Sequence, residues 1–328
     1  MKFTFKKYDF KNTEILSNIY KECFGVNKDV EYFEWKYKLN PAGKAIGFIA
    51  EHEGEVAAFY GVIPETYIVN GKTTTFYQSM DTMTLPKYQR KGLFVKLAKL
   101  TYEYLENINK ELSIIGFPGE TSYGGFVTKL NWRVLIKLNY VFLHKNLFKL
   151  NRIVKNETTF KVDRVDDFDE RFDVYFNQRQ PSIKPIHKLL HRNELNWRYA
   201  AYSRNRYVKL RVMFEDEIVG FVVYTTDDKN RVFLNCIDFV NISGNSKLLK
   251  MVMLYIFDNT KATYIYTLQP NEISLRNNLK RMGFVKNRAD FGPFSYKTPI
   301  ILYGTKEYND VDIFNVNNWN LQPYLRDY

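Results

Sequence analysis

The stretch Leu85-Pro86-Lys87-Tyr88-Gln89-Arg90-Lys91-Gly92-Leu93-Phe94 marks the point where an extended segment gives way to a helix. The extended segment runs from Phe76 to Leu85 and stops at a proline. Apolar residues then recur with helical spacing, at Leu93, Leu97, Leu100 and Tyr104. A strand that enters a helix through a glycine-containing turn presents free backbone N–H groups and the positive end of the helix dipole. The stretch therefore predicts an anion-binding site.

Two short motifs occur twice at the same offset. Trp35-Lys36-Tyr37 recurs as Trp197-Arg198-Tyr199, and Glu55-Val56-Ala57-Ala58-Phe59 recurs as Glu217-Ile218-Val219-Gly220-Phe221. Both offsets are 162 positions (197 − 35 and 217 − 55). Repetition at a fixed offset indicates two copies of one structural unit.

Each half of the chain has the same order of predicted elements: a strand, a helix, hairpin strands, a helix, a strand and a helix. An acidic turn joins two apolar strands in each half, as in a hairpin. This order predicts an α/β fold in which each half has a mixed, mostly antiparallel sheet flanked by helices. We expect one domain over residues 1–150 and another over 158–328, joined by a polar linker at 151–158.

Bulk composition narrows the functional classes. The formal charge is +12, but the basic residues are scattered and no nucleic-acid-binding motif is present, so the excess favours a basic, solvated surface. An anionic cofactor would benefit from the local cluster of Lys87, Arg90, Lys91, Lys96 and Lys99. No apolar run approaches the roughly 20 residues that span a bilayer, and the N-terminus does not resemble a signal peptide. His187 and His191 are spaced i, i+4 without a zinc-site pattern, and surface or capping roles are favoured. We expect a cytoplasmic protein without a metal site, membrane or nucleic-acid partner.

The spacing Gln89-x-x-Gly92 after a strand-ending proline resembles the pyrophosphate loop of the GCN5-related N-acetyltransferases, the GNAT family, in tandem two-domain form. In that family the loop binds the diphosphate of acetyl-CoA, which is the co-substrate that the resemblance implies. Phe94 departs from the family pattern, because a small residue is usual there. The resemblance implies a set of cofactor-binding residues: Met83, Thr84, Leu85, Gln89, Arg90, Lys91, Gly92, Leu93 and Phe94. Within this set, the backbone of Met83 and Leu85 is expected to bind the pantetheine arm and to supply an oxyanion donor.

Acetyl transfer to an amine requires a base and an acid. Asp81 is the first candidate base, because period-two alternation places it on the same strand face as Met83 and Leu85. A structural carboxylate, held by an arginine or by backbone amides, is the alternative reading of Asp81. Glu120 is a second candidate. The resemblance implies a tyrosine acid in the helix after the fifth strand; Val127 occupies that position, and Tyr123, one turn earlier, is the candidate instead.

The second half lacks this loop, because the turn from Asn241 to Ser246 has neither the proline nor the Gln-x-x-Gly spacing. It therefore resembles a degenerate GNAT domain. We expect an N-acetyltransferase that acts on a primary amine of a small molecule, such as an amino sugar, a polyamine or an antibiotic-like amine, by direct transfer in a ternary complex. The chain would be a monomer or homodimer. A non-catalytic CoA-binding or interaction protein and an aminoacyl-tRNA-dependent transferase of the peptidoglycan type are the alternatives.

Overall fold

A computed structural model describes residues 1–149, 160–178, 184–202, 206–240, 246–287 and 297–323. The predicted linker at 151–158 and most of the turn from Asn241 to Ser246 lie outside these ranges. The described chain forms two compact units, which are treated separately below. One consists of Met1–Ile136 with Pro299–Asn318, and the other of Lys137–Thr298 with a C-terminal stretch that begins at Trp319.

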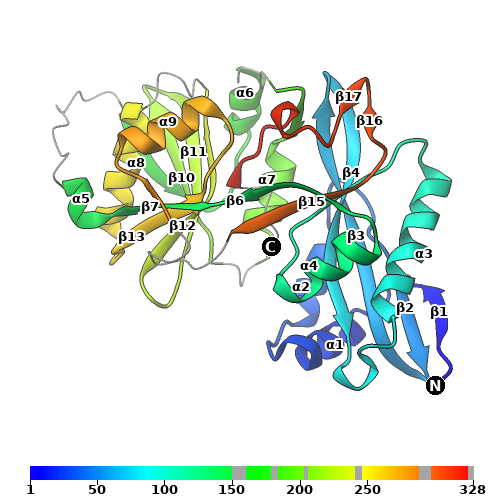
Figure 1. Ribbon diagram of the computed structural model, residues 1–328. Coiled ribbons are helices and arrows are strands. Elements are labelled where there is room, and N and C mark those ends of the chain that lie inside the picture. The colour runs from blue at the N-terminus through cyan, green and yellow to red at the C-terminus, as the bar shows by residue number, and fades with distance from the viewer. Residues whose placement is uncertain (150–159, 179–183, 203–205, 241–245, 288–296, 324–328) are drawn as a thin grey trace. The chain divides into compact units, whose positions relative to one another are not determined.

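The first unit alternates strands and helices in the predicted order (Figure 1). Its strands are β1 (Thr4–Lys7), β2 (Ile46–His52), β3 (Glu55–Val69), β4 (Lys72–Thr84), β5 (Ser113–Gly116), β6 (Arg133–Leu138), β15 (Thr298–Gly304), β16 (Glu307–Tyr308) and β17 (Val311–Asp312). Its helices are α1 (Glu14–Phe24), α2 (Val30–Lys38), α3 (Leu93–Ile108) and α4 (Glu120–Gly124), with short helical turns at Pro86–Tyr88, Gly125–Lys129 and Val316–Asn318.

The first sheet has the strand order β1-β2-β3-β4-β5-β15-β6. Its strands pair antiparallel where the register is defined, except that β4 and β5 run parallel. Helices cover both faces, as two successive residues of β3 demonstrate. Phe59 contacts Tyr37 of α2, whereas Tyr60 contacts Tyr102 of α3. Since neighbouring strand residues point to opposite faces, α2 and α3 lie on opposite sides of the sheet.

The second unit repeats this plan. Its elements are β7 (Tyr140–His144), α5 (Lys145–Lys149), β8 (Phe160–Val165), α6 (Arg171–Gln178), β9 (Ile186–Lys188), α7 (Arg192–Tyr199), β10 (Val208–Phe214), β11 (Glu217–Thr226), β12 (Arg231–Phe239), α8 (Ser246–Asn259), β13 (Tyr264–Leu268), α9 (Ile273–Arg281) and β14 (Val285–Lys286). The sheet order is β14-β7-β13-β12-β11-β10-β8, and only β12 and β13 are parallel. The predicted fold class, two α/β units with mixed sheets, is confirmed.

The repeated motifs occupy equivalent places. Trp35-Lys36-Tyr37 lies in α2 and Trp197-Arg198-Tyr199 in α7, while Glu55 begins β3 and Glu217 begins β11. The acidic turns connect β2 to β3 and β10 to β11 as hairpins. His191 is the N-cap of α7, where its Nδ1 accepts a hydrogen bond from the Glu194 amide at 3.3 Å. This is one of the two roles that the sequence favoured.

The division of the chain differs from the predicted boundaries of 1–150 and 158–328, because the two halves exchange strands. Strand β7 lies before the predicted boundary but pairs with β13 and β14 in the second sheet. Strand β15, from the C-terminal part of the chain, pairs with β5 and lies between β5 and β6 in the first sheet. Each sheet therefore contains a strand from the other half of the sequence.

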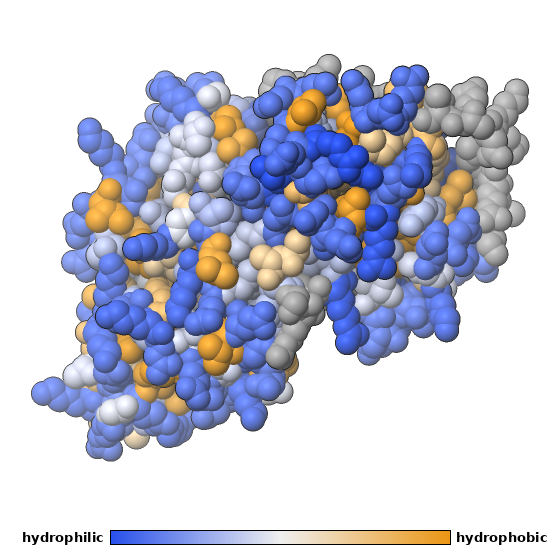
Figure 2. Space-filling model, turned by 180° about the vertical axis from the view of Figure 1, so that it is seen from behind, coloured by the Kyte–Doolittle hydropathy of each residue, from blue (hydrophilic) through white to orange (hydrophobic). Residues whose placement is uncertain are grey.

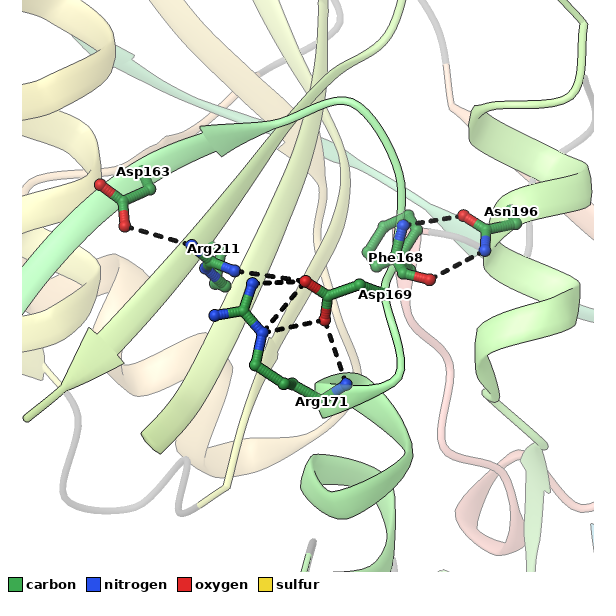
Figure 3. A network of polar contacts seen from close by, with 6 residues as sticks. All are labelled: Asp163, Phe168, Asp169, Arg171, Asn196 and Arg211. Carbon is green, nitrogen blue, oxygen red and sulfur yellow. Dashed lines mark hydrogen bonds and ion pairs between the residues drawn. The ribbon is translucent and has the colours of Figure 1, made fainter. Parts of the chain in front are cut away.

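Polar side chains join several elements of the second unit (Figure 3). The Asn196 amide of α7 accepts a hydrogen bond from the Phe168 N–H at 2.8 Å and donates one to the Phe168 carbonyl at 2.9 Å. Beside it, Arg211 of β10 lies 3.4 Å from Asp163 and 3.6 Å from Asp169. Hydrogen bonding from Arg171 is the main cause that lowers the pKa of Asp169. The network ties the segment before α6 to α7 and β10.

The molecular face in Figure 2 is mainly hydrophilic, with hydrophobic residues in separate spots. Single exposed apolar residues of this kind are normal on protein surfaces. Within the described residues, none of the helices is both long and apolar enough to span a membrane.

Candidate active site

Strands β4 and β5 separate after a short paired region. They pair only at Tyr77 with Ile114 and Gln78 with Ile115, although β4 continues to Thr84. The pairing of β3 with β4 also shifts register between Phe59 and Gly61, which is a β-bulge, and Asp81 there has a φ of 33°. Among the described residues, no strand pairs with the β5 side of β4 from Ser79 to Thr84. Backbone groups along this side are placed to bind an extended ligand.

The direction of the backbone amides corrects one prediction. The Leu85 N–H donates to the Ala57 carbonyl at 3.0 Å, toward β3. Because amide directions alternate along a strand, the Met83 N–H also points toward β3 and the Thr84 N–H toward the open side. Neither Met83 nor Leu85 is therefore placed to donate to a ligand from its amide. Thr84, also among the predicted residues, is the donor on that side.

The loop after β4 leads from a strand through a glycine-containing turn into a helix, which is the local structure on which the predicted anion site depends. Arg90 and Gly92 both have left-handed backbone conformations, with φ of 61° and 76°, and α3 begins at Leu93. The first amides of a helix have no partner within the helix, so those of α3 are directed at the space before it. Backbone turns with such left-handed residues form concave anion sites. Lys87 is engaged elsewhere, since its Nζ lies 2.7 Å from Glu55.

A cavity of about 750 Å³ connects the loop with the separated strands. Seven of the predicted site residues line it: Asp81, Thr84, Gln89, Arg90, Gly92, Leu93 and Phe94. Five others do not: Met83, Leu85, Lys91, Glu120 and Tyr123. Glu120 is exposed in the first turn of α4, and Tyr123 is half-buried. The candidate acid therefore lies outside the cavity wall, although its neighbour Ser122 is part of it.

Asp81 is held by two side chains of α2. Lys36 Nζ lies 3.0 and 2.9 Å from the two carboxylate oxygens, and the Tyr37 hydroxyl donates to Oδ2 at 2.6 Å. The Lys36 side chain is 1% exposed and that of Asp81 is 9% exposed. A structural role was the alternative reading of Asp81, with an arginine or backbone amides as partners; the observed partners are a lysine and a tyrosine. A substrate amine would have to compete with both for the carboxylate.

Phe94 occupies space that a glycine provides. Its ring packs against Phe126 at 4.9 Å and Tyr60 at 6.1 Å between centroids. A Cβ atom at Gly125 would lie 2.7 Å from Phe94 Cε1, so no larger residue fits there without movement. The small residue usual at position 94 is thus replaced by a bulky one, and Gly125 accommodates it.

Sequence reasoning missed three residues around this cavity. Lys36 and Tyr37 belong to the repeated Trp-Lys-Tyr motif, and its recurrence in the sequence was a signal that these residues make contacts important for the structure. Cys23 of α1 lines the cavity, and burial raises the pKa of its thiol to about 11, against an opposing hydrogen bond from the Thr84 backbone. Sulfur is a weak acceptor, so a ligand oxygen is a stronger partner for that amide.

Residues 5–135 match the family of acetyltransferase (GNAT) domains. A search of curated proteins found no similar sequence.

Solved structures share the fold over almost the whole chain. A probable N-acyltransferase of unknown function from Enterococcus faecalis V583 is 9% identical, with a TM-score of 0.67 over 92% of this chain and 72% of the other. Saccharomyces cerevisiae N-myristoyltransferase with bound myristoyl-CoA is 14% identical, with a TM-score of 0.59 over 99% and 83%. A tandem GNAT protein from the clavulanic acid biosynthesis pathway is 8% identical, with a TM-score of 0.57 over 92% and 98%.

At these identities the structural likenesses concern the fold. They agree with the family match of residues 5–135 and with the two sheets of similar strand order. Residues 5–135 therefore match the GNAT domain family, and the chain as a whole has the fold of a tandem GNAT protein.

Proposed function

We propose that the protein is an N-acyltransferase that uses acetyl-CoA and transfers the acetyl group to a primary amine of a small molecule. The observation that carries this proposal is the open side of β4 between Ser79 and Thr84. At one end lies the anion-binding loop around Gly92, which suits a diphosphate. At the other end the strands close, which suits the acylated end of an extended cofactor.

The walls of the closed end favour a short acyl group. Immediately before Ser79 in the chain, β4 and β5 are hydrogen-bonded to each other, and the last pair is Gln78 with Ile115. Trp132 lies directly against the backbone of Gly116, since a Cβ added there would be 2.9 Å from Trp132 Cζ3. This supports acetyl-CoA as the donor, in contrast to the myristoyl-CoA bound in the yeast structures.

The acceptor would enter beside Asp81, so that transfer occurs directly within a ternary complex. Tyr20 and Phe24 of α1 line this cavity and offer aromatic surface to an amino sugar, a polyamine or an antibiotic-like amine. Asp81 remains the proposed base, provided that the amine displaces one of its donors from α2. Glu120 and Tyr123 stay predictions. We also propose a cytoplasmic monomer or homodimer, without a nucleic-acid or membrane partner.

A non-catalytic CoA-binding protein is the second candidate. It is favoured by the occupied oxygens of Asp81 and by the position of Tyr123 away from the cavity wall. The two candidates share cofactor binding and differ in turnover. Release of free CoA thiol in the presence of a panel of primary amines separates them.

Calorimetric titration with acetyl-CoA tests the binding site. A valine at position 92 would strain the left-handed backbone there (φ 76°) without a steric clash, because nothing lies within 4 Å of the added Cβ. We expect one site per chain for the wild type and at least about tenfold weaker binding for Gly92→Val, equivalent to about 1.4 kcal/mol.

Gly71 provides the matched control. It has the same φ of 76° and the same open space, but lies at the tip of the β3–β4 hairpin. Gly71→Val should bind acetyl-CoA like the wild type. Equal binding by Gly92→Val and the wild type would place the cofactor elsewhere.

A further inference from the structure

A chain of buried hydrogen bonds ends at the closed end of the cavity. The Trp132 Nε1–H donates to the Tyr102 hydroxyl at 2.9 Å, and the hydroxyls of Tyr102 and Tyr60 lie 3.2 Å apart. The Tyr60 hydroxyl donates to Ser79 Oγ at 3.0 Å. Trp132, Tyr102 and Tyr60 are all buried, whereas Ser79 is half-buried and lines the cavity. The chain thus leads from the core to the ligand space.

The direction of the hydrogens in this chain is fixed at its buried end. An indole N–H can only donate, so the Tyr102 oxygen accepts from Trp132. If Tyr102 then donates to Tyr60, and Tyr60 to Ser79, every buried hydroxyl hydrogen has an acceptor. The reverse direction would leave the Tyr102 hydrogen without an acceptor among the described residues. Burial also raises the pKa of Tyr60 and of Tyr102, so both hydroxyls keep their protons.

This direction leaves the hydroxyl hydrogen of Ser79 available to a ligand. Ser79 accepts from Tyr60, and no acceptor for its own hydrogen is found in the parts of the chain that the structure describes. Donation by Tyr60 also polarises the Ser79 O–H, because hydrogen bonds in a chain strengthen one another.

The position of Ser79 suits the reacting carbonyl of a bound thioester. It is the first residue of β4 beyond the pairing with β5, and lies five residues, about 15 Å of extended strand, from Thr84. The amides of Met83 and Leu85, expected as oxyanion donors, point toward β3 instead. We propose that the Ser79 hydroxyl donates a hydrogen bond to the thioester carbonyl oxygen and stabilises the oxyanion formed on it. Tyr60 acts as the positioning residue.

This inference rests on the proposed function, and infrared spectroscopy of bound acetyl-CoA tests it directly. The probe is acetyl-CoA labelled with ¹³C at the thioester carbonyl, whose stretching band can be isolated by isotope difference. A lost hydrogen bond moves this band to higher wavenumber. We expect that shift in Ser79→Ala, a smaller one in Tyr60→Phe, and the wild-type band in Ser79→Thr, which keeps a hydroxyl.

Ser122→Ala is the control for changes in cavity polarity. Ser122 also lines the cavity, but its hydroxyl donates to the Gly119 carbonyl at 3.4 Å. Its removal should leave the carbonyl band unchanged. In a turnover assay, Ser79→Ala should lower the rate of acetyl transfer about 100-fold, as for the loss of an oxyanion donor, while the Kd for acetyl-CoA changes less than about threefold.

The outcomes separate this inference from the proposed function. If the wild type binds acetyl-CoA and the carbonyl band is the same in Ser79→Ala, the role of Ser79 is overturned and the proposed function stands. A band that shifts equally in Ser122→Ala also overturns it, since the effect is then unspecific. If the wild type does not bind acetyl-CoA in calorimetry, both proposals fail.

Discussion

At the scale of single residues, the ion pair between Lys36 and Asp81 stands out because both side chains are almost completely buried. An ion pair in such a position contributes little net stability compared with apolar residues, but loss of one partner leaves the other charge unpaired in the interior. Lys36→Met should therefore lower the free energy of unfolding by about 3–5 kcal/mol, measured by urea denaturation followed by circular dichroism.

Lys38 on the same helix is the control. Its Nζ lies 2.9 Å from Glu34, and both side chains are partly exposed. Lys38→Met should change the free energy of unfolding by less than about 1 kcal/mol, as is usual for exposed ion pairs. A similar decrease in the free energy of unfolding in the two variants would show that the buried Lys36–Asp81 pair matters no more for stability than an exposed ion pair.

At the scale of elements, the sequence predicted what depends on local pattern. The hairpins, the strand-to-helix turn at Gln89–Gly92 and the equivalence of α2 and α7 all follow from spacing along the chain. The bulge in β4 could not be predicted from spacing, because it depends on the pairing of β4 with β3. It interrupts the alternation of side chains that was expected to place Asp81 and Met83 on the same strand face. The partners of Asp81 also come from a helix that lies more than 40 residues earlier.

The link between α7 and the segment before α6 gives a second stability prediction at this scale. Asn196 satisfies both backbone groups of Phe168, which is 1% exposed (Figure 3). Asn196→Leu should lower the free energy of unfolding by about 1–3 kcal/mol, because those groups lose their partner. Asn259→Leu, which removes one exposed bond to the Tyr255 carbonyl, should change it by less than about 0.5 kcal/mol. Indistinguishable denaturation curves for the two variants would contradict this reading.

At the scale of the whole molecule, β15 makes the first sheet depend on the C-terminal part of the sequence as well as on residues 4–138, whereas the strands of the second sheet all lie between residues 140 and 286. The predicted domain of residues 1–150 lacks β15, so the inner edges of β5 and β6 would lose their partner. We expect this fragment to show no cooperative thermal unfolding in calorimetry. A fragment of residues 1–138 joined by a flexible Gly/Ser linker to residues 297–318 should regain it. Cooperative unfolding of the 1–150 fragment alone would show that the first sheet does not depend on β15.

The position of β15 in the first sheet also delays the completion of that sheet during synthesis of the chain on the ribosome. The ribosome must add 168 residues (304 − 136) after the end of the N-terminal segment before the last strand of the first sheet has been made. At the usual 5–20 residues per second, this delay is roughly 10–30 s. Through that interval the nascent chain presents unpaired strand edges, which invite association with other polypeptides. Holding chaperones would therefore act on this protein mainly in the interval after the segment Met1–Ile136 has been synthesised and before β15 has emerged to complete the first sheet.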